Sequence, residues 1–169
     1  MRPVARVRGE EIAEYLAHHG AIAAQHDDLA RADLTGARLV GAKGLNKYPT
    51  TPLYGLRDQV GPIRAYKLVT AASVGPYNSG ITYVVGQSVE VADASTDELQ
   101  QCAAGINLAS LDWCCRFWQP GYRILVAEFL AADLAAIPIA SDGKFRVHRC
   151  TIVAEKDLVE LGLVAAVKR

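Results

Sequence analysis

The residues that follow the dipeptide Asp142-Gly143 could bind an anion. Lys144, Arg146 and His148 are cationic or titratable side chains spaced two residues apart. In an extended chain successive side chains point to opposite faces, so this spacing puts all three on one face of a strand. A guanidinium binds two phosphate oxygens at once, an ammonium is a mobile point charge, and an imidazole gains charge near neutral pH. The stretch therefore predicts an anion-binding face.

Arg146 also has a structural interpretation. Buried strands often hold one arginine against one acid, and Glu128 and Glu155 both stand at predicted strand ends. In that case the arginine forms a structural ion pair and does not meet a ligand. The sequence leaves the two roles open.

A second candidate lies in the segment "CAAGINLASLDWCCRFW". Gly105 permits close approach of a ligand, while Asn107 and Ser110 offer hydrogen bonds. A helix that begins after Ser110 would present free N–H groups, which suit phosphate. The alternative is that Gly105 serves a turn, Asn107 bonds the backbone and Ser110 is a simple helix cap.

Four aromatic residues could form a platform on which a nucleobase stacks: Tyr66, Tyr83, Trp113 and Trp118. Aromatic residues at such positions are more often part of the core. Trp118 falls on the apolar stripe of the predicted helix and is assigned to packing, while Trp113 lies off that stripe. Trp113 is therefore the better candidate for a site or an interface.

The four cysteines, Cys102, Cys114, Cys115 and Cys150, show no zinc-binding spacing. No metal site is therefore predicted. A site made of Cys102, Cys150 and His148 is geometrically conceivable, because His148 and Cys150 share a strand face. The alternative is that the thiols are reduced, small, apolar core residues.

Composition bounds the class of protein. The chain has 169 residues, of which 51% are apolar, so it can bury a sizeable core. Lys plus Arg and Asp plus Glu number 18 each, so no overall field recruits nucleic acid or an anionic membrane, and any contact with a polyanion must be local. No apolar run reaches the roughly 18 residues that span a bilayer, and the arginine-rich start lacks the apolar stretch of a secretion signal. We expect a cytoplasmic protein.

The first 46 residues predict a helix and a short repeat. "EEIAEYLAHHG" has apolar residues at helical spacing and Gly20 as its stop. "DDLARADLTGARLVGAKGL" then repeats every five residues, with alanine and leucine at fixed positions, until Gly44 takes the place of a leucine. These units resemble pentapeptide-repeat proteins, and the resemblance implies about one coil of a right-handed β-solenoid, with Leu34 and Leu39 pointing inward.

The rest of the chain predicts a linker and a main domain. Residues 47–61 are rich in proline and glycine and predict an irregular connection. Residues 62–169 alternate β-rich segments with three predicted helices, which begin near Ser95, Ser110 and Lys156. Asp142-Gly143 predicts a type I′ turn between two strands, with Pro138 placing the first of them at a sheet edge. The predicted fold class is α+β, with a mainly antiparallel sheet domain preceded by the helix and the coil.

A more specific resemblance runs over residues 65–150. The order "AYKLV", "YVVGQSVEV", "CAAGINLASLDWCCRF", "ILVAEF", "SDGKFRVHRC" resembles a C-terminal domain of unknown function that accompanies pentapeptide stretches in bacteriophage proteins. More distantly, it is similar to ADP-ribosyltransferase-type folds and RNA 2′-phosphotransferases, which bind NAD or a phosphoribosyl group in a split sheet. The resemblance therefore implies a nucleotide-like ligand.

This chain departs from those enzymes at two positions. Lys67 stands where they have histidine or arginine after a tyrosine, and Asn107 stands where related sequences often have histidine. Lys67 could still neutralise a phosphate and Asn107 could bond a ribose or an amide, but neither supplies a histidine for proton transfer. Glu128 and Glu155 are the candidates for an acid that stabilises a positive sugar carbon, and their roles stay open.

These observations predict a small phage-type accessory protein that recognises a nucleotide-like phosphorylated ligand and counteracts host signalling or defence. The alternatives are an NAD-dependent ADP-ribosyltransferase-like enzyme, with NAD or a related nucleotide as its cofactor, and an adaptor that docks on a host protein without a small ligand. No membrane partner is expected, and a homo-oligomer is left open. The candidate ligand-binding residues are Tyr66, Lys67, Gly105, Asn107, Ser110, Trp113, Lys144, Arg146 and His148.

Overall fold

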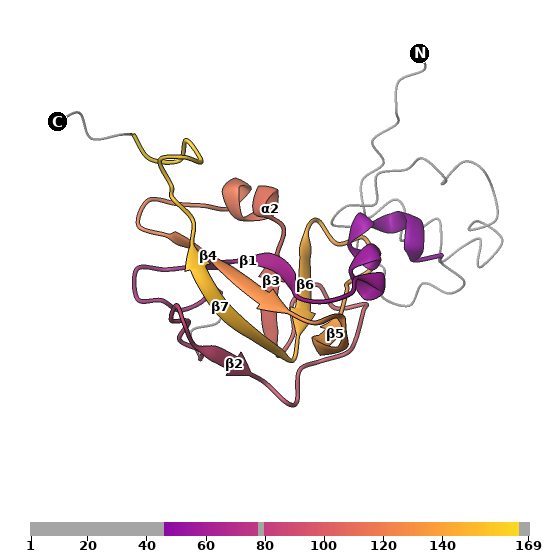
Figure 1. Cartoon of the computed structure of the whole chain (residues 1–169). Helices are drawn as coiled ribbons and strands as arrows, with labels where there is room; N and C mark the ends of the chain where they lie inside the picture. Colours follow the sequence, from indigo (N-terminus) through magenta and orange to yellow (C-terminus); the bar gives the residue numbers. More distant parts are fainter. Residues whose placement is uncertain (1–45, 78–79, 166–169) are drawn as a thin grey trace, which may run out of the picture.

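One antiparallel sheet dominates the computed structural model, which describes residues 46–77 and 80–165 (Figure 1). Its seven strands lie in the order β2-β7-β4-β1-β3-β6-β5. Figure 1 shows β3 and β6 running steeply across the direction of β1, β4 and β7. The strands are β1 Ile63–Val69, β2 Ser88–Glu90, β3 Ile106–Ala109, β4 Arg123–Phe129, β5 Leu134–Ala136, β6 Lys144–Val147 and β7 Arg149–Glu155.

Helices are few and short. One α-helix, α2 (Leu111–Arg116), lies within the described ranges, together with the 3-10 helices η2 (Tyr48–Thr50), η3 (Pro52–Asp58) and η4 (Ala131–Asp133). None of the helices in this part of the chain has the length and apolar character needed to cross a membrane.

The central strands β1 and β4 are paired along their whole length, from Ile63 opposite Phe129 to Val69 opposite Arg123. Strand β4 is almost continuously apolar because it lies between β1 and β7 and is covered on both faces. Ile124 and Leu125, which are adjacent and so face opposite sides, are both completely buried.

Each face of the sheet has its own core. Ala65 and Val69 of β1 pack into the larger cluster with residues of β3, β4, β6 and β7. Leu68, which points to the other face, packs with Trp113 and Cys114 of α2 in the smaller cluster. Strand alternation therefore divides β1 between two cores, and α2 covers one of them.

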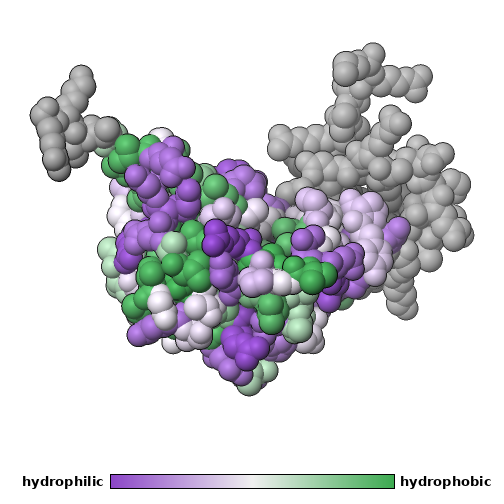
Figure 2. All heavy atoms as spheres, in the orientation of Figure 1, coloured by the Kyte–Doolittle hydropathy of each residue, from purple (hydrophilic) through white to green (hydrophobic). Residues whose placement is uncertain are grey.

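Some large apolar side chains stay at the surface, including Val60, Val84 and Val85. Figure 2 shows apolar patches interrupted by hydrophilic residues on the face viewed there. Exposed apolar residues of this kind are ordinary in globular proteins and identify no docking surface by themselves.

The predicted α+β class is wrong. The described residues form a mainly antiparallel sheet with few helices. Of the three helices predicted for residues 62–169, the described part of the chain contains only the one after Ser110. The capping-box pattern at Ser95 and Glu98 lies in an irregular loop, because the carbonyls of Ser95 and Asp97 bond the side chain of Arg146 instead of a helical turn. The segment that begins at Lys156 forms successive turns. Ser110 is the N-cap residue of α2, directly before its first residue, but its side chain makes no capping hydrogen bond.

Other local predictions differ in detail. The strand before Pro138 ends at Ala136, so residues 137–143 form a longer connection than a type I′ turn. Residues 47–61 fold into η2 and η3, and Tyr54 of η3 is buried and donates to the carbonyl of Ile137 at 3.1 Å. The predicted N-terminal helix and pentapeptide coil lie outside the described residues, and no solenoid occurs within them.

The backbone at Gly105 requires glycine for two reasons. Its φ of +128° is a conformation that other residues rarely adopt, and an added Cβ would lie 2.8 Å from the Cβ of Ala94. We expect Gly105→Ala to destabilise the fold by about 2 kcal/mol or more in urea unfolding, through backbone strain and overpacking. Gly121→Ala is the control, because Gly121 also has a positive φ but has open space around its Cβ position. Equal losses for the two variants would show that the contact with Ala94 adds nothing.

Candidate functional site

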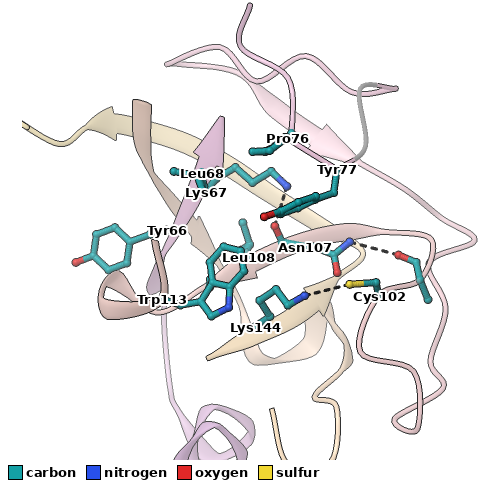
Figure 3. A pocket seen from close by; sticks show the side chains of 13 residues that line it. Tyr66, Lys67, Leu68, Pro76, Tyr77, Cys102, Asn107, Leu108, Trp113 and Lys144 are labelled. Carbon is teal, nitrogen blue, oxygen red and sulfur yellow. Dashed lines mark hydrogen bonds between the residues drawn. The ribbon is translucent and has the colours of Figure 1, made fainter. Parts of the chain in front are cut away.

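A cavity of about 270 Å³ lies between β1 and β3. Both strands contribute adjacent residues to its lining, and α2, β6 and two loops complete it (Figure 3). The lining residues are Tyr66, Lys67, Leu68, Gly75, Pro76, Tyr77, Cys102, Ala103, Asn107, Leu108, Ala109, Trp113 and Lys144.

The cavity exists because β1 and β3 pair at one position only. Tyr66 lies opposite Ala109, and the two strands then separate, whereas β1 follows β4 for its full length. Beyond that position the ammonium of Lys67, on β1, donates to the carbonyl of Asn107, on β3, at 2.8 Å. A side chain therefore links the two strands where their pairing has ended.

Lys67 is a buried cation. It is only 8% exposed, and its Nζ lies 4.7 Å from the ring centroid of Tyr83. Burial lowers the pKa of Lys67 to about 8; the thiols of Cys150 and Cys114 oppose this shift, and the charge of Lys144 adds to it. The amine is therefore easier to deprotonate than an ordinary lysine.

Lys144 brings a second ammonium to the same cavity. Its Nζ lies 3.0 Å from the sulfur of Cys102 and 5.4 Å from the ring centroid of Trp113. Lys144 is partly exposed, so its charge faces the opening while that of Lys67 is deeper. Figure 3 shows the two amines approaching the cavity from different strands.

Neither amine is neutralised by an acid. In residues 46–77 and 80–165, no ion pair involves Lys67 or Lys144, and no aspartate or glutamate is found among the lining residues. The cavity is therefore positively charged, although the chain as a whole carries a net charge of zero.

The indole of Trp113 forms a fixed wall. Its Nε1 donates to Asp142 at 3.0 Å, and its ring stacks on Phe117 with 4.5 Å between centroids. The side chain is 6% exposed, so the part that lines the cavity is held between packed neighbours. Tyr77, in contrast, is 73% exposed and lines the cavity from a loop. The walls thus include one buried and one exposed aromatic ring.

The structure brings together five of the predicted site residues and separates the other four. Those that line the cavity are Tyr66, Lys67, Asn107, Trp113 and Lys144. Gly105 is buried against Ala94, and Ser110 has a buried hydroxyl without a hydrogen-bond partner. His148 lies beyond the end of β6, with its Nδ1 3.3 Å from the carbonyl of Val91.

Arg146 is completely buried and bonds the backbone. Its Nε donates to the carbonyl of Ser95 at 3.0 Å, its Nη1 to that of Gln100 at 2.7 Å, and its Nη2 to that of Asp97. Burial lowers the pKa of this guanidinium. Arg146 therefore fixes the loop that covers β6 and offers no donor at the surface.

The acids proposed as partners of Arg146 are paired elsewhere. Glu128 accepts from Arg64 at 2.8 Å, and Glu155 accepts from the Nε of Arg123 at 2.9 Å. The alternative in which Arg146 pairs with Glu128 or Glu155 is thus wrong. Arg146 has a structural role, but its partners are backbone carbonyls. Strand alternation fixes the face of β6 on which Arg146 lies, but it does not show that a loop closes over that face.

Sequence reasoning missed two contributions to the cavity. Tyr77 follows a Gly-Pro turn and gave no periodic signal, and Cys102 had been grouped with Cys150 and His148. In the structure Cys102 is exposed beside Lys144, whereas Cys150 is buried in the larger core. No cluster of three or more potential metal ligands occurs in the described part of the chain.

Comparison with known proteins finds no matching family model, no matching curated protein and no matching solved structure. The resemblances to pentapeptide-repeat proteins and to ADP-ribosyltransferase-type folds therefore stay predictions from the sequence.

Loss of Arg146 should destabilise the protein strongly. Arg146→Met would remove the guanidinium donors from the carbonyls of Ser95, Asp97 and Gln100, and we expect a cost of about 3 kcal/mol or more in urea unfolding. Arg64→Met is the control, because it removes a solvent-exposed ion pair, with an expected cost of about 1 kcal/mol or less. Similar losses for the two variants would contradict the role given to the buried guanidinium.

Lys67 should make stability depend on pH in the alkaline range. Its pKa is about 8 in the folded state, against 10.5 for an unperturbed lysine, so its charge disfavours folding below pH 8, and this penalty disappears as the pH rises from 8 toward 10.5. The wild type gains this free energy of unfolding as the pH rises, and Lys67→Met does not. The free energy of unfolding of Lys67→Met minus that of the wild type should therefore fall by roughly 2 to 3 kcal/mol between pH 7 and pH 10.5.

The measurement is urea unfolding of both proteins at each pH. The raised pKa values of Cys114 and Cys150, about 12 and about 11, act in the opposite direction, because the unfolded thiols ionise first as the pH rises. Both thiols are present in both proteins, so the difference between the two reports the titration of Lys67 together with the effect of its charge on these thiols. A difference that stays constant with pH would contradict the lowered pKa.

Proposed function

We propose that the protein binds a small, phosphorylated, nucleotide-like molecule in the cavity between β1 and β3. The observation that carries this proposal is the presence of two lysine amines, Lys67 and Lys144, in one cavity whose described lining contains no carboxylate. An anion is the ligand that compensates such a charge. The volume, about 270 Å³, suits a small molecule and not a macromolecular segment.

The lining assigns a part of the ligand to each group. Lys144 is partly exposed and approaches a thiol and an aromatic ring, so its ammonium is the anchor for the phosphate. The indole of Trp113 offers a flat apolar surface for a planar ring. Lys67, deeper in the cavity, faces a second polar group of the ligand, while its hydrogen bond to Asn107 holds it in place.

ADP-ribosyl transfer has less support. Cleavage of a glycosidic bond calls for an acid near the positive sugar carbon, and the two sequence candidates, Glu128 and Glu155, lie outside the cavity in ion pairs with arginines. The setting in a phage-infected bacterium and the docking of a host protein rest on the sequence resemblance alone and stay predictions.

Phosphate recognition is tested by calorimetric titration of nucleoside monophosphates and of the same nucleosides without phosphate. We expect binding of at least one monophosphate that weakens with salt, because its anchor is an ion pair. Lys144→Met should weaken this binding roughly 10- to 100-fold, the effect of losing one charge-assisted contact.

Lys156→Met is the matched control, because Lys156 is also a lysine of the domain but pairs with Glu160 outside the cavity. It should leave affinity unchanged. Equal binding of nucleoside and monophosphate, or an equal loss in both variants, would contradict the proposal.

A further inference from the structure

The position of Lys67 is unusual for a lysine. It lies on the face of β1 that carries Ala65 and Val69 into the larger core, and its amine is buried against an aromatic ring. A buried ammonium without an acid is costly, and its one acceptor is a neutral main-chain carbonyl. The features of the site thus raise the fraction of neutral amine above that of an ordinary lysine, and the neutral amine is a nucleophile.

We propose that Lys67 forms an imine with an aldehyde or ketone group of a phosphorylated ligand whose phosphate is held by Lys144. This inference rests on the proposed function and deepens it, because it adds a carbonyl group to the ligand class. Three features of the cavity carry it: the buried amine, the hydrogen bond that orients this amine, and a second cation at the opening of the same cavity.

The hydrogen bond to Asn107 orients the nucleophile. A carbonyl oxygen can only accept, so a neutral Lys67 amine must direct one N–H toward Asn107. Its lone pair then points away from that oxygen. The backbone acceptor thereby holds the amine in one orientation, and the lowered pKa, about 8, gives a larger neutral fraction than an ordinary lysine has near neutral pH.

The reaction needs no oxidant and no cofactor. The lone pair of the amine forms a C–N bond with the carbonyl carbon, and the π pair of the C=O bond moves to oxygen, which takes one of the two N–H protons. The resulting carbinolamine loses its hydroxyl and the remaining N–H proton as water, which leaves a C=N bond. Amine plus carbonyl thus gives imine plus water. The charge of Lys144 contributes by holding the phosphate and by disfavouring a second ammonium nearby.

The experiment uses two aldehydes that share a ring and differ in phosphate, pyridoxal 5′-phosphate and 5′-deoxypyridoxal, neither of which can close its aldehyde into an internal hemiacetal. The whole chain is incubated with each, reduced with borohydride to fix any imine, digested and mapped by mass spectrometry. We expect pyridoxal 5′-phosphate to label Lys67 before the ion-paired lysines Lys47 and Lys156, and roughly ten-fold faster than 5′-deoxypyridoxal does, as expected for a phosphate contact of about 1.4 kcal/mol.

Variants separate the two lysines. Lys67→Arg keeps a positive charge but cannot form an imine, so the fast label should disappear and should not move to Lys144, while phosphate binding is retained. Lys144→Met should reduce the labelling of Lys67 by pyridoxal 5′-phosphate to the level given by 5′-deoxypyridoxal. Lys67→Met is a second variant without the amine, so the result does not depend on the folding of the arginine variant alone.

The outcomes distinguish this inference from the proposed function. If monophosphates bind but the label is spread over surface lysines, or lies on Lys144, the imine is excluded and the anion site stands. If both aldehydes label Lys67 equally, the amine chemistry stands and the phosphate anchor is excluded. If pyridoxal 5′-phosphate leaves Lys67 unlabelled and monophosphates do not bind, both proposals fail.

Discussion

Two buried cations bond main-chain carbonyls, and the arrangement of the sheet depends on them. Lys67 donates to Asn107 across the gap between β1 and β3, and Arg146 donates to three carbonyls of the loop that covers β6. A carbonyl buried without a donor costs about as much as a lost hydrogen bond. In the gap and in the irregular loop, a long cationic side chain therefore supplies donors to main-chain carbonyls.

This use of cations explains the charge of the cavity. The exposed arginines Arg64 and Arg123 pair with glutamates, so their charges are compensated at the surface. Lys67 bonds a neutral carbonyl, and Lys144 approaches a thiol and an indole. Within the described ranges, no acid therefore compensates the charges of these two lysines. A chain with equal numbers of acids and bases thus acquires a local positive site. The charge comes from where the acids lie, and not from an excess of basic residues.

The sequence predicted part of the site for a sound reason. Lys67, Asn107 and Trp113 were chosen from three segments with clear local patterns, and these segments became β1, β3 and α2, which do meet at the cavity. Arg146 was a candidate both for an anion-binding face and for a structural ion pair, because alternation along β6 defines a face but not what covers it. The helix predicted near Ser95 failed for the same reason, since its carbonyls bond a side chain about 50 residues away.

The sequence by itself determined that segments such as β1, β4 and β6 extend and which of their side chains share a face, because both follow from a local period of two residues. It also determined that the charge of the chain is balanced. Only the tertiary structure decided that β1 and β3 separate after one pair, that a loop encloses Arg146, and that Lys67 and Lys144 face one cavity. Those outcomes depend on strand order and on hydrogen bonds between residues 40 or more positions apart, which no local pattern encodes.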